Sequence, residues 1–285
     1  MNTMNKRNIQ LILEDLNVKP NKKLGQNFLV NKNIALKVIS ESNISGNDVI
    51  LEIGSGLGAL TEELAKLHNK IYSYEIDFKL FQYLTKKFPK NKNLMFYNED
   101  ILKADIPSHS LVISNIPYSI TGAIIEKVFY NKNPPRGALI IEESIAERIF
   151  FKNEYKKFSR ITVSFNAFME PVKKYKISRF NFIPTPKIDM ALIIVKPKDD
   201  IDQFLLTDKG RKFYLKFVAG IMPYKNKNIL NALSLFVKNE DIGNFSKNDI
   251  YNFINGTKNL NRKIAQLKVD EIVLLSKSIF ALLYN

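Results

Sequence analysis

The sequence predicts an α/β protein, with a doubly wound domain followed by a smaller, all-helical domain. Apolar runs of strand length recur through the first 198 residues, and segments with helical spacing of apolar residues separate them. Beyond about residue 203 the strand pattern stops and amphipathic helical patterns replace it. The alternation favours a parallel sheet covered by helices, and we place the domain boundary near residue 199.

Five apolar runs in the first domain are predicted to be strands of the parallel sheet. They cover residues 49–53, 70–76, 94–100, 111–116 and 137–143. Helices are predicted between them, over residues 60–67, 79–88 and 122–130. Residues 189–198 are predicted to be a last strand that closes the sheet, whereas residues 159–169 fit either a short helix or a strand.

The ends of the chain differ in character from the predicted sheet. Residues 1–23 form a polar lead that carries lysines, and we expect it to precede the folded sheet within a first domain of residues 1–198. Residues 199–285 are predicted to form the helical domain. Its amphipathic segments cover residues 209–222, 228–237 and 270–284.

Composition excludes several kinds of chemistry. The chain has no cysteine and only two histidines, so it has no disulfide, no thiolate metal site and little material for a zinc centre; we expect no metal. No apolar run approaches the roughly 18 residues of a membrane span, and no secretory signal pattern is present, so a cytoplasmic location is expected.

Charge favours a polyanionic partner. Forty-three basic residues against 28 acidic ones give a net charge of +15. Such an excess is typical of proteins that bind nucleic acid or an acidic membrane surface, and nucleic acid is the favoured interpretation. A genome that encodes lysine and asparagine frequently would produce the same bias without any such partner.

A glycine turn follows the first predicted strand, in the segment LEIGSGLGALTEEL at residues 51–64. Gly54, Gly56 and Gly58 follow a G-x-G-x-G spacing, whereas the dinucleotide fingerprint is G-x-G-x-x-G. Together with Glu52, this spacing favours S-adenosylmethionine over NAD. Glycines also occur in tight strand-to-helix turns that bind nothing, so the turn alone leaves both interpretations open.

Two carboxylates follow the next predicted strands. Glu75 ends the second strand and Asp100 ends the third. Ligands of open α/β sheets bind at the carboxyl ends of the strands, where Glu75 can accept both ribose hydroxyls and Asp100 an adenine amino group. The alternative is that both acids are ordinary solvated residues. The glycine turn, Glu75 and Asp100 each follow a different predicted strand at its carboxyl end, however, and this favours the cofactor site.

The fourth strand ends in an Asn-Ile-Pro-Tyr turn at residues 115–118. The exocyclic amine of adenine is a poor nucleophile because its lone pair is delocalised into the ring. The Asn115 side-chain oxygen and the Ile116 carbonyl would accept the two amine hydrogens and localise the lone pair. Tyr118 would stack on the base, and Pro117 would stiffen the turn.

These motifs together resemble the ribosomal RNA adenine dimethyltransferases, over nearly the whole chain. The segments that carry the resemblance are KKLGQNFLVN (22–31), LEIGSGLGALTEEL, YEID (74–77), NEDI (98–101), SNIPYSIT (114–121) and FIPTPKIDMALI (182–193). The resemblance implies a Rossmann-like methyltransferase domain and a small helical domain that contacts RNA. It also implies S-adenosylmethionine as cofactor and adenines of ribosomal RNA as substrate.

The resemblance assigns individual residues to the site. Those implied to bind the cofactor are Gln26, Asn27, Leu29, Gly54, Gly56, Glu75, Ile76, Asp100, Ile101 and Asn115. Those implied to act on the base are Asn115, Ile116, Pro117, Tyr118 and Phe182. Phe182 is expected at the mouth of the pocket, where it would face Tyr118 across a flipped-out adenine.

The family has two branches, and the small-subunit branch is favoured. Ser114, the chain length and the basic segment 221–236 resemble the enzymes of ribosome maturation, whereas the alternative branch modifies the large subunit and confers macrolide resistance. We expect a monomer that acts on a small-subunit precursor. Three further interpretations are a ribosome-assembly factor in which methylation is secondary, a DNA adenine methyltransferase and a protein glutamine methyltransferase; Ile116 disfavours the last two.

Overall fold

The computed structural model describes residues 6–151, 158–239, 246–254 and 260–284, so the first five residues of the polar lead lie outside it. The chain forms two compact units. The first contains Met1–Phe129, Pro134–Ala146 and Pro171–Pro197, and the second contains Tyr130–Asn133, Glu147–Glu170 and Lys198–Asn285. The second unit therefore combines the C-terminal region with two earlier stretches, residues 130–133 and 147–170.

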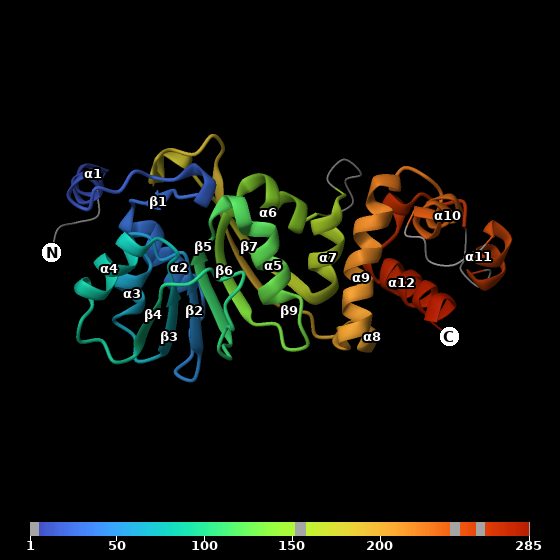
Figure 1. Ribbon diagram of the computed structural model, residues 1–285, viewed down its shortest axis with the longest axis horizontal. Helices are drawn as coiled ribbons and strands as arrows, with labels where there is room; N and C mark the ends of the chain where they lie inside the picture. Colours follow the sequence, from blue (N-terminus) through green and yellow to red (C-terminus); the bar gives the residue numbers. More distant parts are fainter. Residues whose placement is uncertain (1–5, 152–157, 240–245, 255–259, 285) are drawn as a thin grey trace. The chain divides into compact units, whose positions relative to one another are not determined.

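A seven-stranded sheet with the order β4-β3-β2-β5-β6-β9-β7 is the centre of the fold (Figure 1). Its strands are β2 (Val49–Ile53), β3 (Lys70–Tyr74), β4 (Leu94–Tyr97), β5 (Leu111–Asn115), β6 (Arg136–Glu142), β7 (Met169–Ile177) and β9 (Met190–Pro197). The first five are parallel, which confirms the predicted strands. After β4 the chain crosses to the other side of β2 to form β5, and ligands bind at such switch points.

The far side of the sheet differs from the prediction. β9 is the last strand in the sequence, but it pairs antiparallel with β6 and has β7 as its outer neighbour. β7 was not predicted, because its sequence MEPVKKYKI carries three lysines and leaves most side chains exposed, as suits an edge strand. The ambiguous stretch forms a helix, α7 (Arg160–Phe168), which begins with a capping box between Ser159 and Thr162.

Helices flank the sheet. Those of the first unit are α1 (Lys6–Asp15), α2 (Lys32–Glu41), α3 (Thr61–Leu64), α4 (Phe78–Lys87) and α5 (Thr121–Phe129), and α6 (Glu143–Ile149) follows β6. The predicted polar lead contains α1, which buries Ile9 and Leu13 in a cluster with Phe28 and Leu57. The lead is therefore partly folded, and its apolar stripe packs against the first residues of the site.

The second unit is helical, which confirms the predicted class of the C-terminal region. After α7 its helices are α8 (Gln203–Leu206), α9 (Asp208–Ile221), α10 (Ile229–Asn239), α11 (Lys247–Ile254) and α12 (Val269–Tyr284). Aromatic rings fill its core: Phe217 packs edge-on against Phe236, with ring centroids 5.1 Å apart. Within the described part of the chain, no helix has the length and apolar character needed to cross a bilayer.

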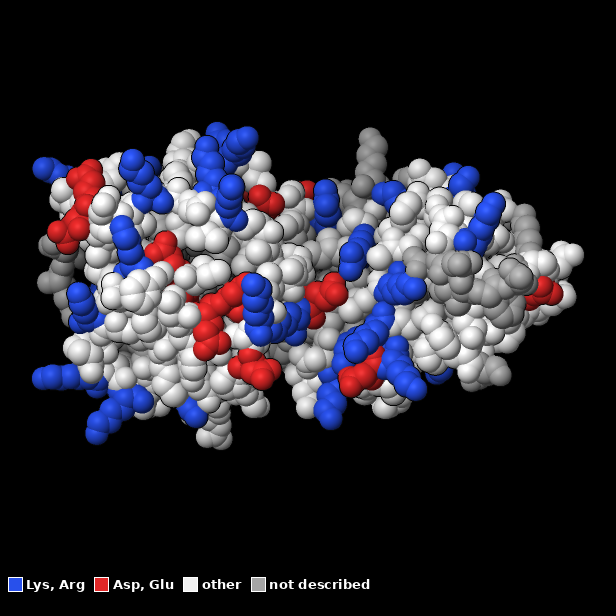
Figure 2. Space-filling view, in the orientation of Figure 1, with Lys and Arg blue, Asp and Glu red and all other residues white. Residues whose placement is uncertain are grey.

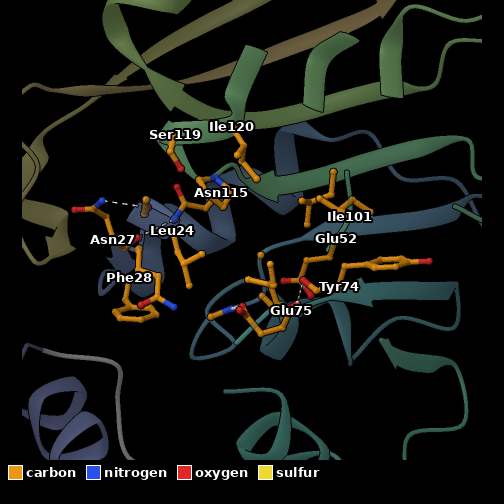
Figure 3. Close-up of a pocket in the computed structure, with 18 of the residues that line it drawn as sticks. Leu24, Asn27, Phe28, Glu52, Tyr74, Glu75, Ile101, Asn115, Ser119 and Ile120 are labelled. Atoms are coloured by element: carbon orange, nitrogen blue, oxygen red, sulfur yellow. Dashed lines mark hydrogen bonds between the residues drawn. The ribbon is translucent and has the colours of Figure 1, made fainter. Parts of the chain in front are cut away.

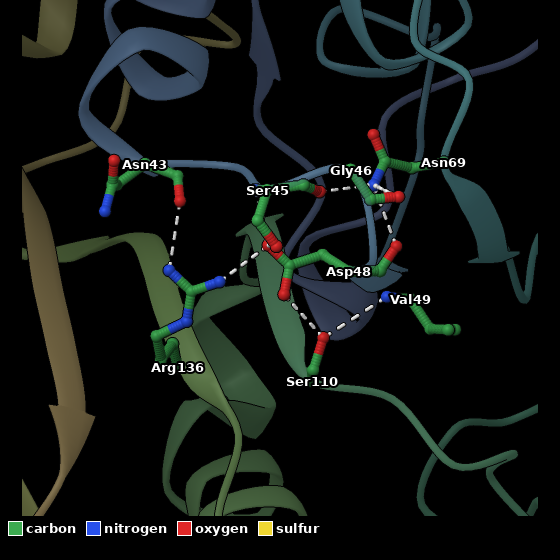
Figure 4. A network of polar contacts seen from close by, with 8 residues as sticks. All are labelled: Asn43, Ser45, Gly46, Asp48, Val49, Asn69, Ser110 and Arg136. Carbon is green, nitrogen blue, oxygen red and sulfur yellow. Dashed lines mark hydrogen bonds and ion pairs between the residues drawn. The ribbon is translucent and has the colours of Figure 1, made fainter.

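A buried carboxylate joins the amino-terminal ends of three strands (Figure 4). Asp48 precedes β2 and accepts hydrogen bonds from Arg136 Nη2 (2.6 Å), Ser110 Oγ (2.7 Å) and the Ser45 backbone (2.7 Å). Burial acts to raise the pKa of Asp48, but these hydrogen bonds outweigh it and lower the pKa to about 2. The network therefore holds the amino-terminal ends of β2, β5 and β6 together, at the opposite end of the strands from their carboxyl ends.

Asp48→Asn is expected to lower the free energy of unfolding by on the order of 1–2 kcal/mol near neutral pH. A folded-state pKa below the unfolded value gives stability that is present above about pH 4 and lost as pH falls toward about 2. Urea unfolding of both proteins at several pH values measures this difference. A gap between them that stays constant down to pH 2 would contradict the role of the ionised carboxylate.

Candidate active site

A cavity of about 220 Å³ lies at the carboxyl ends of the parallel strands (Figure 3). Its wall is formed by the residues around the ends of β2, β3, β4 and β5 and by the segment 23–29. The lining includes all ten residues that the sequence assigned to the cofactor: Gln26, Asn27, Leu29, Gly54, Gly56, Glu75, Ile76, Asp100, Ile101 and Asn115. The sheet topology thus brings together five segments that are far apart in the sequence.

The glycine turn after β2 has a backbone that only glycine adopts readily. Gly54, Gly56 and Gly58 have φ of 70°, 57° and 84°. A Cβ on Gly54 would lie 3.1 Å from the Pro117 ring, and one on Gly56 would lie 3.0 Å from the Phe28 ring. The turn therefore places backbone without side chains in the cavity wall and packs closely against Pro117 and Phe28.

Glu75, directly after β3, connects the glycine turn to the next strand. Its carboxylate accepts hydrogen bonds from the backbone N–H of Gly56 (2.8 Å) and of Asp77 (2.9 Å). The side chain is only 5% exposed, and burial raises its pKa against the lowering effect of these two hydrogen bonds. Glu75 thus presents a largely desolvated carboxylate at the cavity, held in place by backbone groups.

Glu52 lies in β2 beneath the turn and also reaches the cavity wall. It accepts hydrogen bonds from the hydroxyls of Thr61 (2.9 Å) and Ser73 (2.8 Å). Burial raises the pKa of Glu52 to about 7, although these hydroxyls lower it. The sequence reasoning used Glu52 only as part of the turn motif and gave it no role in the site.

The segment before α2 forms the opposite wall. Its strand β1 (Phe28–Leu29) pairs antiparallel with β8 (Phe182–Ile183). Gln26 lines the cavity and connects two segments, because its Oε1 accepts the Asn21 N–H (2.8 Å) and its Nε2 donates to Asp77 (3.3 Å). The predicted Gln-Asn-Phe-Leu segment is therefore bound to the chain that follows Glu75.

The ends of β3 and β4 add one polar and two apolar side chains. Asp100 Oδ1 accepts the Leu102 N–H at 3.0 Å, which fixes the carboxylate at the turn after β4. Ile101 is buried, whereas Ile76 is 47% exposed. This part of the cavity combines a carboxylate acceptor with flanking aliphatic surface, a lining that suits a flat heterocycle with one amino group.

Asn115 ends β5 with its amide held in a single orientation. Its Nδ2 donates to the backbone carbonyl of Asn27 at 3.0 Å. Its Oδ1 is buried and has no hydrogen-bond partner among the described residues. A buried acceptor without a partner is costly, and here it lies in the wall of the cavity, available to a donor on a ligand.

The turn after Asn115 packs tightly against the segment that holds it. Gly25 has φ of 64°, and a Cβ built on it would lie 2.8 Å from the backbone nitrogen of Tyr118 and 3.1 Å from that of Ser119. These residues begin the short helix η2 (Tyr118–Ile120). The turn is therefore enclosed between Gly25 on one side and Gly54 on the other.

Two of the predicted base-contacting residues, Asn115 and Pro117, line the cavity. The expected position of Phe182 at the pocket mouth is wrong for this structure, since its ring is fully buried in the core cluster that also contains Leu29. The reason is its pairing with Leu29 across β1 and β8, which turns the ring inward. Tyr118 is half-buried against the same cluster, and Ile116 is fully buried.

Sequence reasoning missed Gly25 as a site residue, although it stood inside a segment that the resemblance used. The available signal was a lone glycine between Leu24 and Gln26, but only the fold shows what its missing Cβ makes room for. No cluster of three or more histidine, aspartate or glutamate side chains suited to a metal occurs in the described ranges.

Gly25→Ala is expected to lower methyl transfer about tenfold or more, because the added Cβ displaces the backbone of Tyr118 and Ser119 and strains a positive φ. Gly122→Ala is the matched control, since a Cβ at that position would have nothing within 4 Å. Methylation rate and melting temperature are measured on both variants. Equal rates for the two would contradict the role of the close contact.

Glu52→Gln is expected to alter how stability depends on pH. A carboxyl whose folded pKa is raised to about 7 gives stability that is present below about pH 4.5 and lost as pH rises through 7. The wild-type free energy of unfolding should therefore fall relative to the variant across this range, by on the order of 2 kcal/mol. Parallel curves from pH 4 to 8 would place the Glu52 pKa near its ordinary value.

Comparison with known proteins agrees with this geometry. The family model described as ribosomal RNA adenine dimethylase matches residues 17–277. A relative from Thermotoga petrophila, named ribosomal RNA small subunit methyltransferase A, is 34% identical over 262 residues, which cover 92% of each chain.

Two solved structures share the fold. A dimethyladenosine transferase from Plasmodium falciparum superposes with a TM-score of 0.73 at 22% identity, covering 86% of this chain and 94% of that one. The 23S rRNA methyltransferase ErmE superposes with a TM-score of 0.62 at 22% identity, covering 89% and 99%. The match over residues 17–277 and the relative of nearly equal extent show that the chain belongs to the ribosomal RNA adenine dimethylase family.

Proposed function

We propose that this chain transfers methyl groups from S-adenosylmethionine to the exocyclic amine of adenines in small-subunit ribosomal RNA, two to each base. The observation that carries the proposal is the Asn115 amide. Its donor end is bound to the Asn27 carbonyl, so its buried, unpartnered oxygen is the end that faces a ligand. An amine with two hydrogens is the donor that such an acceptor suits.

The residues of the cavity fit S-adenosylmethionine, which supplies a methyl group bonded to a positively charged sulfur. Glu75 offers its desolvated carboxylate to the ribose hydroxyls, and Asp100 offers an acceptor to the adenine amino group. Gly54 and Gly56 have no Cβ atoms, which would otherwise crowd Pro117 and Phe28 in the cavity wall. Gln26, Asn27 and Leu29 would hold the methionine end, and Ile76 and Ile101 would provide apolar surface for the adenine.

The protein activates the substrate by orienting its amine. When Asn115 Oδ1 and the Ile116 carbonyl accept the two N–H groups, the lone pair leaves conjugation with the ring and points at the methyl carbon. The new C–N bond takes both electrons of that lone pair, and the C–S electrons remain on sulfur. The methylated nitrogen is cationic and releases its proton to water, so no strong base is required.

The rings near Asn115 are proposed to hold the base. The Tyr118 ring is uncharged at neutral pH, and burial raises the pKa of its phenol further; an uncharged aromatic ring suits stacking on a base. Pro117 stiffens the turn at the cavity wall. Phe182 is fully buried in the core cluster, so its predicted stacking role is not part of this proposal.

Two observations support the small-subunit branch over the alternatives. The Thermotoga relative, named for the small subunit, matches 92% of both chains. All ten residues implied to bind the cofactor, Asn115 among them, line the cavity. This supports a catalytic protein over one that only binds the ribosome during assembly. The large-subunit alternative has a fold neighbour in ErmE, whose 22% identity supports the fold alone.

The helical unit is proposed to add RNA contacts. Lys209, Lys212 and Lys216 are exposed along α9, at spacings that place them on one face of the helix. Cations in such a row interact with phosphates without reading sequence. We further propose that the chain acts as a monomer in the cytoplasm, on a small-subunit precursor particle.

Asn115→Ala is expected to lower methyl transfer by about two to four orders of magnitude while leaving cofactor binding nearly intact. Asn115→Asp should be nearly as inactive, because a carboxylate oxygen facing the Asn27 carbonyl repels it. The measurement is transfer of labelled methyl groups to unmethylated small ribosomal subunits. Thermal stabilisation by S-adenosylmethionine, about 2.7 kcal/mol at a hundredfold excess over Kd, checks cofactor binding.

The same assay tests the function itself. Wild-type protein should produce dimethyladenosine in small-subunit RNA and little in large-subunit RNA. Modification of the large subunit alone would replace the proposal with the alternative branch. An Asn115→Ala protein that has lost cofactor binding as well would show that Asn115 supports the fold of the site, and the proposed activation of the amine would lose its main support.

A further inference from the structure

An exposed aromatic ring lies in the loop between β7 and β9. Phe180, in the short helix η4 (Arg179–Asn181), is 61% exposed. The Arg179 guanidinium carbon lies 5.3 Å from the centre of its ring, and Lys6 Nζ of α1 lies 6.0 Å from it. Single exposed apolar residues are common on proteins, but an exposed ring with two cations over it is a more specific arrangement.

The loop holds this arrangement in place. The Arg179 N–H donates to Asp189 Oδ1 at 3.0 Å, and Arg179 Nη1 donates to the Lys187 carbonyl at 2.7 Å. Ser178 caps η4 by accepting the Phe180 N–H at 3.4 Å. These hydrogen bonds fix the Phe180 backbone and the Arg179 side chain. A partner that binds here therefore loses little free energy in ordering the loop.

The ring lies close to the wall of the cavity. Phe180 precedes Ile183 by three positions, a span of at most about 11 Å. Ile183 pairs with Phe28, which lines the cavity, and the Asn181 carbonyl accepts the Val30 N–H at 2.9 Å. A strand of nucleic acid whose target base enters the cavity would extend over Phe180 within a few nucleotides.

The surroundings are basic. Figure 2 shows lysine and arginine side chains gathered over the chain around β1 and the loop from β7 to β9. The exposed basic residues of these segments and of the start of α1 are Lys6, Arg7, Lys22, Lys23 and Lys187. A ring that is 61% exposed, with cations over part of it, suits a base stacked on the exposed part and phosphates bound by the cations.

We propose that Phe180, with Arg179 and Lys6, is a stacking platform for single-stranded RNA next to the target adenine. The proposal rests on the proposed function, because it takes the strand that carries the target base as the occupant. The platform recognises the face of a base and the charge of the backbone, so it binds single-stranded RNA with little preference for sequence. An isolated apolar contact with a protein would not use the two cations, and an acidic membrane would not require the ring.

The direct test is the affinity for a labelled single-stranded oligoadenylate RNA of about 12 nucleotides, by fluorescence anisotropy. Phe180→Ala should weaken binding about 5- to 100-fold, whereas Phe180→Trp should retain or improve it. Arg179→Gln should lower the slope of log K against log salt by about 0.7. Phe78→Ala is the control, since Phe78 is 58% exposed on α4 and its ring stacks on that of its neighbour Phe81.

Melting temperature and stabilisation by S-adenosylmethionine should be unchanged in Phe180→Ala. An unchanged RNA affinity in this variant would overturn the platform, and so would an equal loss in Phe78→Ala. Loss of binding to anionic vesicles, with RNA affinity retained, would assign the surface to a membrane and overturn it as well. If the wild type binds the RNA through Phe180 but methylates no small subunit, the proposed function fails while the platform stands.

Discussion

The site depends on one hydrogen bond, from the Asn115 amide to the backbone carbonyl of Asn27. It joins the end of the fourth parallel strand to the segment that forms the opposite wall of the cavity, 88 residues earlier in the chain. An amide has one donor end and one acceptor end, so binding the donor to a carbonyl decides which end faces the ligand. The absence of a Cβ at Gly25 and Gly54 allows both walls to approach the turn closely enough for this bond to form.

The two edges of the sheet use buried carboxylates in opposite ways. At the amino-terminal edge, Asp48 has an arginine and several hydrogen-bond donors, and its pKa falls to about 2, so it is a charged structural group. At the carboxyl edge, Glu52 has only hydroxyl partners and a second carboxylate nearby, and burial raises its pKa to about 7. The first edge is stabilised by full pairing. At the second, the hydrogen bonds to Glu52 offset only part of the cost of burying its charge, as is typical of ligand sites.

The sequence was sufficient to predict the parallel strands, because their buried residues form continuous apolar runs such as VILEI, and the glycine turn, because its spacing is local. It predicted the glycine turn, Glu75 and Asp100 in the cavity lining because parallel strands end at the same side of a sheet, whereas residues 26–29 of the lining came from the family resemblance. It did not predict β7, because the exposed lysines of this edge strand interrupt the apolar pattern of a strand. It also did not predict the helix in the lead, which is short and mostly polar. Gly25 was also out of reach, since its partner Tyr118 is 93 residues away and only the fold brings them together.

The burial of Phe182 follows from the same construction. The Phe182 backbone pairs with Leu29, and Leu29 belongs both to the cavity wall and to the core cluster that covers the ring. The segment that faces the cofactor is therefore directly paired with the residue expected to face the base. A pair of strands only two residues long thus places the cofactor-facing segment and the buried Phe182 side by side.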